Sequence, residues 1–184
     1  MPTVRDIIIR AFSKAKITSS GEEPTSDEIN DGLEEYRSMI EQFATGGMFG
    51  RLRDVYENSD YDAQPGERVT LTNGATATLP TDVDDERAPY DLSYIELIDR
   101  DAETVERHLY ENGGWVPIHN LSLSDEAPLA SRGRSGLSAC LAMILADEFG
   151  GEVGAATMRQ AAAFKTSLSL KLGGSAERPT AEYF

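Results

Sequence analysis

The chain has 184 residues, a hydrophobic fraction of 40%, a charged fraction of 27% and a formal net charge of -15 at pH 7. This length suffices for a buried core, whereas the acidic balance disfavours proteins that dock on phosphate backbones through clustered Lys and Arg. The single cysteine excludes an internal disulfide, and no run approaches the roughly 20 apolar residues of a membrane span. Because charges interrupt the apolar residues of Met1–Ile17, we expect no secretory leader and a protein made in the cytoplasm.

The first fifty residues predict two amphipathic helices. Apolar residues recur at helical spacing from Val4 to Ala15, which makes the stripe of the first helix. The second helix begins at Thr25, which forms a capping-box pair with Glu28, and it ends near Gly46. Its stripe consists of Ile29, Leu33, Tyr36, Ile40 and Phe43. Each helix therefore has one face that another element must cover.

The middle of the chain predicts antiparallel strands. Asn73-Gly74 stands between alternating apolar residues, which is a strong hairpin signal. Strand-like alternation continues in Leu92–Asp99 and Glu103–Tyr110, and a turn at Asn112 leads into a strand that Pro117 places at a sheet edge. From residue 54 to residue 106 the chain has fifteen acidic residues against three arginines, so we expect a well-solvated insertion.

The stretch after Arg132 allows two interpretations. Gly133, Ser135 and Gly136 nearly match the Gly-x-Ser-x-Gly elbow of a hydrolase, but the second glycine comes one residue early and no strand precedes it. A helix that has Ser135 as its N-cap and ends at Gly150 explains more. Its apolar positions are Leu137, Cys140, Leu141, Ile144 and Leu145. We therefore expect a buried helix and no catalytic residue.

A fourth helix is expected from Val153 to Leu172, closed by Gly173-Gly174. Its predicted inner face carries Ala161, Phe164, Leu168 and Leu172. The fold class is then mainly α with a β-rich insertion (α+β), a four-helix bundle interrupted by antiparallel strands and followed by an extended C-terminal tail. The predicted boundaries are residues 1–50 and 128–173 for the bundle, 51–127 for the acidic insertion and 174–184 for the tail.

Arg132 and Arg134 stand near the N-terminal end of the third helix, where the helix dipole disfavours cations. We expect a compensating acid within the chain or on a neighbouring subunit, which makes both arginines candidate subunit-interface residues. The tail ends in Tyr183 and Phe184, and aromatic side chains dominate contact energies, so it is a candidate anchoring arm. A frayed end without a role is the alternative.

The residues predict neither a metal site nor a cofactor. His108 and His119 have no Cys or second His at a ligand spacing and are expected to be ordinary sheet residues. Asp82, Asp84 and Glu86 match the first positions of a calcium loop, whose later Gly and Glu are absent. With so many acids, a carboxylate pair for glycoside cleavage stays open as an alternative.

Four segments occur in a fixed order around the insertion. They are the helix at 4–15, INDGLEEYRSMIEQFATGGMF at 29–49, LSLSDEAPLASRGRSGLSACLAMILADEFG at 121–150 and AATMRQAAAFKTSL at 155–168. This order, with the extended tail, resembles the head-to-tail adaptor of short-tailed bacteriophages, also called the packaged-DNA stabilisation or tail-accessory protein. The resemblance covers nearly the whole chain outside Leu52–His119, and the acidic insertion departs from the compact helical members of that family.

The resemblance implies a structural virion protein and no enzyme. Such a protein forms a dodecameric ring below the portal, extends the DNA channel and offers an attachment surface to tail nozzle or fibre proteins. DNA would pass through without specific binding, and the low basic content suits such a channel. The protein would be monomeric when free and would join the virion in the host cytoplasm. The implied portal-binding arm consists of Gly174, Arg178, Pro179, Glu182, Tyr183 and Phe184.

Two alternatives come from other classes of protein. One is a small carboxylate-based hydrolase, which requires a deep pocket holding two acids whose pKa values are raised. The other is an acidic protein-binding module of a host cell, unrelated to a virus.

Overall fold

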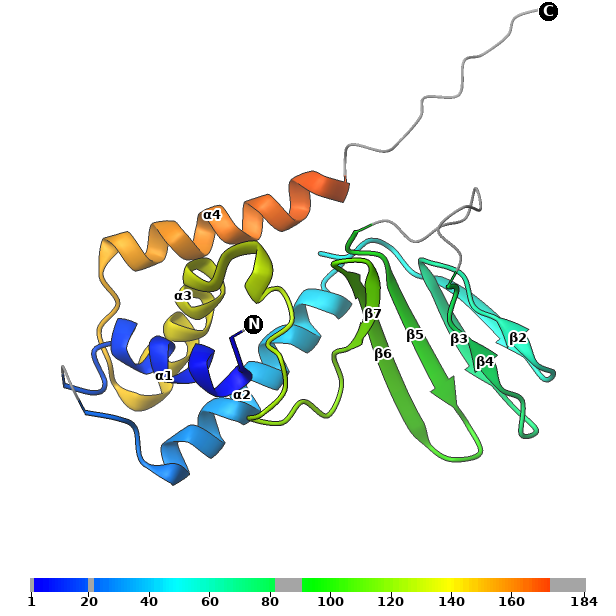
Figure 1. Cartoon of the computed structure of the whole chain (residues 1–184), viewed down its shortest axis with the longest axis horizontal. Coiled ribbons are helices and arrows are strands. Elements are labelled where there is room, and N and C mark those ends of the chain that lie inside the picture. Colours follow the sequence, from blue (N-terminus) through cyan, green and yellow to red (C-terminus); the bar gives the residue numbers. More distant parts are fainter. Residues whose placement is uncertain (1, 20–21, 82–90, 173–184) are drawn as a thin grey trace, which may run out of the picture.

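A computed structural model describes residues 2–19, 22–81 and 91–172, which form a helical part and a β part (Figure 1). The helices of the described residues are α1 (Val4–Lys14), α2 (Ser26–Thr45), α3 (Ala130–Phe149) and α4 (Ala155–Leu172). The strands are β1 (Arg53–Glu57), β2 (Tyr61–Asp62), β3 (Glu67–Leu71), β4 (Ala77–Thr78), β5 (Tyr94–Asp99), β6 (Thr104–Glu111) and β7 (Gly114–Pro117). The chain is therefore α+β, with the strands between α2 and α3. None of these helices is long and apolar enough to cross a membrane.

The two N-terminal helices begin at side-chain caps. The Thr3 hydroxyl accepts the Asp6 N–H at 3.2 Å, and the Asp6 carboxylate accepts the Thr3 N–H at 3.0 Å. Thr25 and Glu28 form the predicted capping box of α2, and α2 ends at Gly46. The predicted stripe of α1 is buried along its whole length. Local sequence signals thus set the bounds of both helices.

Helix α3 packs against both α1 and α4 and also contacts α2. Its crossing with α4 depends on Gly136, because a Cβ there would lie 2.5 Å from Cβ of Phe164. A Cβ on Gly32 of α2 would likewise lie 2.7 Å from Cγ2 of Ile8. The glycine that resembled part of a hydrolase elbow therefore permits close helix packing.

The predicted start of α3 is wrong. The helix begins at Ala130, its N-cap residue is Leu129, and Gly133 interrupts the helical backbone with φ 169° and ψ 75°. Ser135 lies inside the helix, where its hydroxyl donates to Oε1 of Gln160 at 3.1 Å and accepts from Nζ of Lys14 at 3.3 Å. It therefore links three helices instead of capping one.

The predicted buried face and end of α3 are confirmed in large part. Leu137, Cys140, Leu141 and Leu145 are buried, and Ile144 is half-buried. Gly150 ends the helix in the left-handed region, with φ 69°, and its N–H donates to the Ala146 carbonyl. In α4, the predicted inner residues Ala161, Phe164 and Leu168 are buried as well, whereas the side chain of Leu172 lies outside the described part of the structure.

The five-stranded sheet has the order β1-β3-β5-β6-β7 and is mixed. β1 pairs with β3 and β3 with β5 in parallel, whereas β5–β6 and β6–β7 are antiparallel. The prediction of a wholly antiparallel insertion is therefore wrong. The turn at Asn112-Gly113 does join β6 to β7, and β7 with Pro117 is an edge strand, as predicted.

The predicted hairpin at Asn73-Gly74 is also wrong, although the turn forms. Both residues have positive φ, and the Ala75 N–H donates to the Thr72 carbonyl at 3.2 Å. However, both edges of β3 are taken by β1 and β5, so the chain leaves the sheet. β4 instead pairs in parallel with β2 in a small second sheet.

The two parts have separate hydrophobic cores. The larger core lies among the helices and includes Tyr94 and Leu109 from the sheet. The smaller core consists of Ala63, Val69, Leu71, Ala75, Ile95 and Leu97, with Tyr61 and Ala77 of the small sheet packed against it. The two faces of the five-stranded sheet therefore have different neighbours, the small sheet on one and α2 on part of the other.

Replacing Leu141 with Ala should destabilise the protein by about 2–5 kcal/mol, because Leu141 is fully buried in the larger core. Met143 of the same helix is exposed, so Met143→Ala should change the free energy of unfolding by no more than about 0.5 kcal/mol. Urea melts followed by circular dichroism measure both. Equal effects of the two substitutions would contradict the assigned helix face.

Candidate functional site

Several predicted site residues lie outside the described part of the chain. They are the arm residues Gly174, Arg178, Pro179, Glu182, Tyr183 and Phe184, and the acidic residues Asp82, Asp84 and Glu86. Within the described ranges, no group of three or more His, Cys, Asp or Glu side chains is arranged to hold a metal ion.

Arg132 has its compensating acids within the chain. Its guanidinium pairs with Asp91, and its Nε lies 3.7 Å from Oε1 of Glu111, too far for a hydrogen bond. The side chain is only 11% exposed. Arg134 is exposed, and its charge assists the Thr3 N–H in lowering the pKa of Asp6. Of the two arginines, Arg134 is thus the more accessible to a neighbouring subunit.

Glu111, the last residue of β6, is buried and holds the start of α3. Its carboxylate accepts the Leu129 N–H at 2.8 Å and the hydroxyl of Ser131. The N-cap residue Leu129 makes no side-chain cap bond of its own, so the sheet supplies the missing acceptor. A carboxylate at a helix N-terminus also interacts favourably with the helix dipole.

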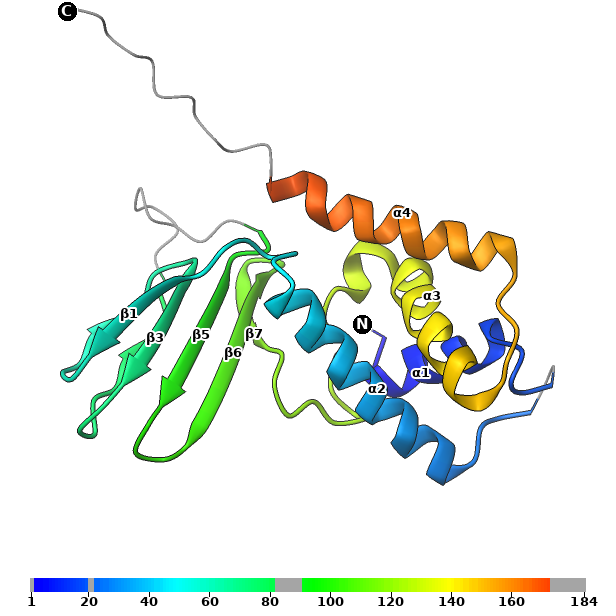
Figure 2. The ribbon, with the colours of Figure 1, turned by 180° about the vertical axis from the view of Figure 1, so that it is seen from behind.

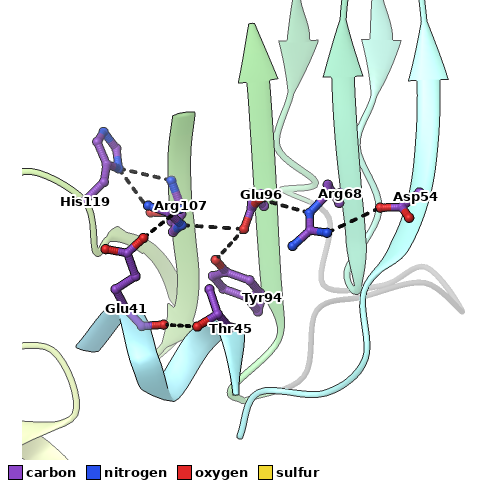
Figure 3. A network of polar contacts seen from close by, with 8 residues as sticks. All are labelled: Glu41, Thr45, Asp54, Arg68, Tyr94, Glu96, Arg107 and His119. Carbon is purple, nitrogen blue, oxygen red and sulfur yellow. Dashed lines mark hydrogen bonds and ion pairs between the residues drawn. The ribbon is translucent and has the colours of Figure 1, made fainter. Parts of the chain in front are cut away.

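A row of alternating charges crosses the sheet face next to α2 (Figure 3). The strand register places Asp54, Arg68, Glu96 and Arg107 side by side on β1, β3, β5 and β6. We call these four residues the charged row.

Glu96 is the buried centre of the charged row. It lies 2.9 Å from Nε of Arg68 and 3.5 Å from Nε of Arg107, and it accepts the Tyr94 hydroxyl at 3.1 Å. Burial and the Glu96 carboxylate raise the pKa of Tyr94, which keeps the phenol protonated as a donor. Arg107 also lies 3.0 Å from Glu41, so the charged row is tied to α2.

Beyond the charged row, the next row of the same face is apolar. The register places Tyr56, Thr70, Ile98 and Val105 side by side across the same four strands. We call these residues the apolar row. Tyr56 is 71% exposed and Val105 37% exposed, whereas Ile98 is half-buried and Thr70, the polar member of the row, is buried.

The apolar row lies outside both hydrophobic cores. Among the described residues, neither core includes Tyr56, Ile98 or Val105. The helical part covers the other end of this face, where Phe49 contacts Tyr94 at a ring-centroid distance of 6.0 Å. The sheet end with the loop between β5 and β6 lies apart from the helices in both views (Figures 1 and 2). Beyond the charged row, this face thus leaves Tyr56 and Val105 exposed.

One cavity lies beside the β6–β7 turn and bears on the hydrolase alternative, because two glutamates line it. It has a volume of 270 Å³, and its lining includes Glu111, Glu126, Trp115 and Pro128. Both carboxylate oxygens of Glu111 are already bonded at the start of α3, so neither is free to protonate a leaving group.

The other buried glutamates have structural partners too. Glu67 pairs with Arg53 and accepts the Tyr61 hydroxyl at 3.1 Å and the Gln64 N–H at 2.9 Å. Glu96 binds two arginines, as described above. This geometry is typical of carboxylates that hold elements together, because each negative charge is matched by donors from neighbouring segments.

The sequence predicts that the β part is acidic, but it does not predict which acidic and basic side chains pair across the sheet. The charged and apolar rows arise from the parallel pairing of β1, β3 and β5, which are neighbours in the sheet although β2 and β4 lie between them in the chain. His108 lies on β6, as expected, whereas His119 lies outside the strands, two residues after β7. Their ring centroids are 5.6 Å apart.

No protein-family model matches this sequence, and a search of curated proteins finds no significant match.

Glu111→Gln should lower the free energy of unfolding by about 1.5–3 kcal/mol, because the change removes a charged acceptor from the Leu129 N–H and the negative charge that faces Arg132. Glu106→Gln on the same strand is the matched control, since Glu106 is exposed. Chemical denaturation at pH 7 measures both variants. An effect no larger than that of the control would show that Glu111 does not secure α3.

Cys140 should resist thiol reagents in the folded protein. Burial raises the pKa of its thiol to about 11, and its Sγ lies 3.7 Å from the Ala161 carbonyl oxygen. At pH 8 the thiolate population should then be roughly 100-fold lower than in the unfolded chain. A colorimetric disulfide reagent, added with and without urea, tests this. Rapid labelling of the native protein would disprove the buried position.

Proposed function

We propose that this protein is a structural head-to-tail adaptor of a short-tailed bacteriophage. Copies of it form a ring below the portal, extend the DNA channel and present the β part to tail nozzle or fibre proteins. The observation that carries the proposal is that helices before and after the strands pack into one helical part. An acidic sheet with a partly exposed apolar row projects from it (Figure 1).

The helical part supports the proposal through its connectivity. Helices α1 and α2 precede the strands, α3 and α4 follow them, and α3 contacts the other three. In the proposal these helices are the four-helix bundle of the adaptor, and residues 174–184 are the arm that reaches the portal. The near-match to a hydrolase elbow is explained by the packing of Gly136 against Phe164.

The charge supports a channel through which DNA slides. Acidic residues outnumber basic ones by 32 to 17. A wall with few clustered cations does not hold phosphates, so DNA passes without specific binding. High net charge also keeps free copies soluble and apart until the portal gathers them.

A host protein-binding module is the second candidate, and the exposed apolar row is the observation that favours it. Open apolar patches rimmed by charge mark interaction surfaces in many proteins. A hydrolase is not favoured, because Glu67, Glu96 and Glu111 are all bound to structural donors.

Purified protein mixed with the portal of the same phage should give a ring of density below the portal in electron micrographs. Removing residues 174–184 should weaken portal binding at least about tenfold, because the arm loses its two aromatic anchors. The melting temperature of the free protein should stay nearly unchanged.

The matched control is Thr180→Ala in the same arm, which keeps both aromatic residues. Absence of portal binding by the full chain would refute the proposed function. Equal binding by the truncated chain would refute only the role of the arm.

A further inference from the structure

We infer that copies of this chain associate head to tail, with the exposed side of α4 of one copy packed on the apolar row of the next. The inference rests on the proposed ring and names the two surfaces that form it. Both surfaces belong to the described residues and carry complementary charge and shape.

The first surface is the apolar row on the sheet. Tyr56 and Val105 are among the large apolar side chains that are exposed, and Ile98 lies between them in the register. Arg100 lies over the Tyr56 ring, 6.0 Å from its centroid. Covering such a row removes apolar area from water, which favours association.

The surroundings of the apolar row define the charge of its partner. Residues 55–57, 69–71 and 97–106, which hold the apolar row and the loop beside it, contain five acidic residues, whereas Arg100 is the basic residue of these ranges. Arg68 is already paired with Glu96 and Asp54 in the charged row. The segment that covers this end of the sheet should therefore be basic and free of carboxylates.

Helix α4 has this charge. Its sequence contains no Asp or Glu and contains Arg159, Lys165 and Lys171, in a chain whose net charge is -15. Its inner side is occupied by the core, whereas Arg159 and Lys165 are exposed. The most basic of the described helices thus has an outer side that the monomer leaves open.

The outer side of α4 also has a suitable shape. Met158, Ala162, Lys165 and Ser169 follow one another at helical spacing and are all exposed, with Met158 at 48%. From Met158 to Ser169 the helix rises about 16 Å. The apolar row crosses three strand spacings, which amounts to about 14 Å. Small side chains along this stripe let the helix lie close to the sheet, with Met158 as the apolar contact.

The two surfaces differ and occupy separate parts of the molecule. Helix α4 runs along one border of the helical part, whereas the loop between β5 and β6 lies at the far end of the sheet (Figure 1). A contact between two different surfaces leaves one surface of each kind unpaired at the two ends of a row of copies. Further copies therefore add, and the row closes into a ring where the rotation between copies allows it. This is the type of contact that a ring of identical subunits requires.

The test uses one variant for each surface, assembled on portals and counted by native mass spectrometry. The helix variant is Arg159→Glu with Lys165→Glu, and the sheet variant is Tyr56→Ser with Val105→Ser. Each should lower the association of copies at least about tenfold. The matched controls are Arg10→Glu and Met143→Ser, which change exposed residues outside both surfaces and should assemble normally.

Mixing the two variants identifies the pairing. Only the intact α4 of the sheet variant and the intact apolar row of the helix variant can then meet, so the mixture should give dimers and no rings. In a separate pair of chains, Met158→Cys and Val105→Cys should be joined by a short bismaleimide, whereas Arg10→Cys and Val105→Cys should not. Cys140 is buried and does not compete.

The outcomes separate this inference from the proposed function. If the wild-type chain forms rings on the portal and both surface variants do so equally well, the inference is wrong and the proposed function stands. If the wild-type chain does not bind the portal, the proposed function fails. Cross-linking of the two cysteine variants at high protein concentration then still decides whether these surfaces pair.

Discussion

The junction between the two parts depends on the buried carboxylate of Glu111. It ends β6, accepts the Leu129 N–H and the Ser131 hydroxyl, and faces Arg132, so it ties the N-cap residue and the first turn of α3 to the sheet. Burial and the Glu111 charge raise the pKa of Tyr36, whose neutral hydroxyl donates to the Pro128 carbonyl at 3.3 Å. Strand, helix and connecting segment are thereby held at one point, and the sheet is a fixed part of the molecule next to α3.

The charged row compensates the buried Glu96 and links the sheet to α2. A buried glutamate is tolerated only when donors or positive charges compensate it. Glu96 accepts hydrogen bonds from Arg68 and Tyr94, and it forms an ion pair with Arg107 on the strand at its other side. Because Arg107 also reaches Glu41 of α2, the row marks where the helical part meets the sheet. Beyond it, Tyr56 and Val105 are exposed on the same face, so the network that stabilises the sheet lies next to a surface available to another molecule.

These features fit a protein whose chemistry is contact with other proteins. Buried carboxylates are used to join segments, glycines to bring helices together, and the single cysteine to fill the core. Opposite charges are separated between the acidic sheet and the basic α4, and such separation favours ordered association of copies over random aggregation. In the proposed adaptor, the helical part belongs to the ring and the sheet carries the surface that is particular to this protein.

The sequence by itself determined what depends on neighbouring residues. The capping boxes of α1 and α2, the buried stripes, the end of α3 at Gly150, the Asn112-Gly113 hairpin and the edge strand with Pro117 follow from spacing and turn chemistry. Only the tertiary structure decided the rest. At Asn73-Gly74 the turn is present but the hairpin is not, because β3 pairs with β1 on one edge and with β5 on the other. Ser135 does not cap α3; instead, Glu111 of β6 accepts the N–H of the N-cap residue Leu129. Both rows on the sheet exist because strands distant in sequence lie side by side. Contacts between distant residues carry no local pattern, so spacing along the chain could not reveal them.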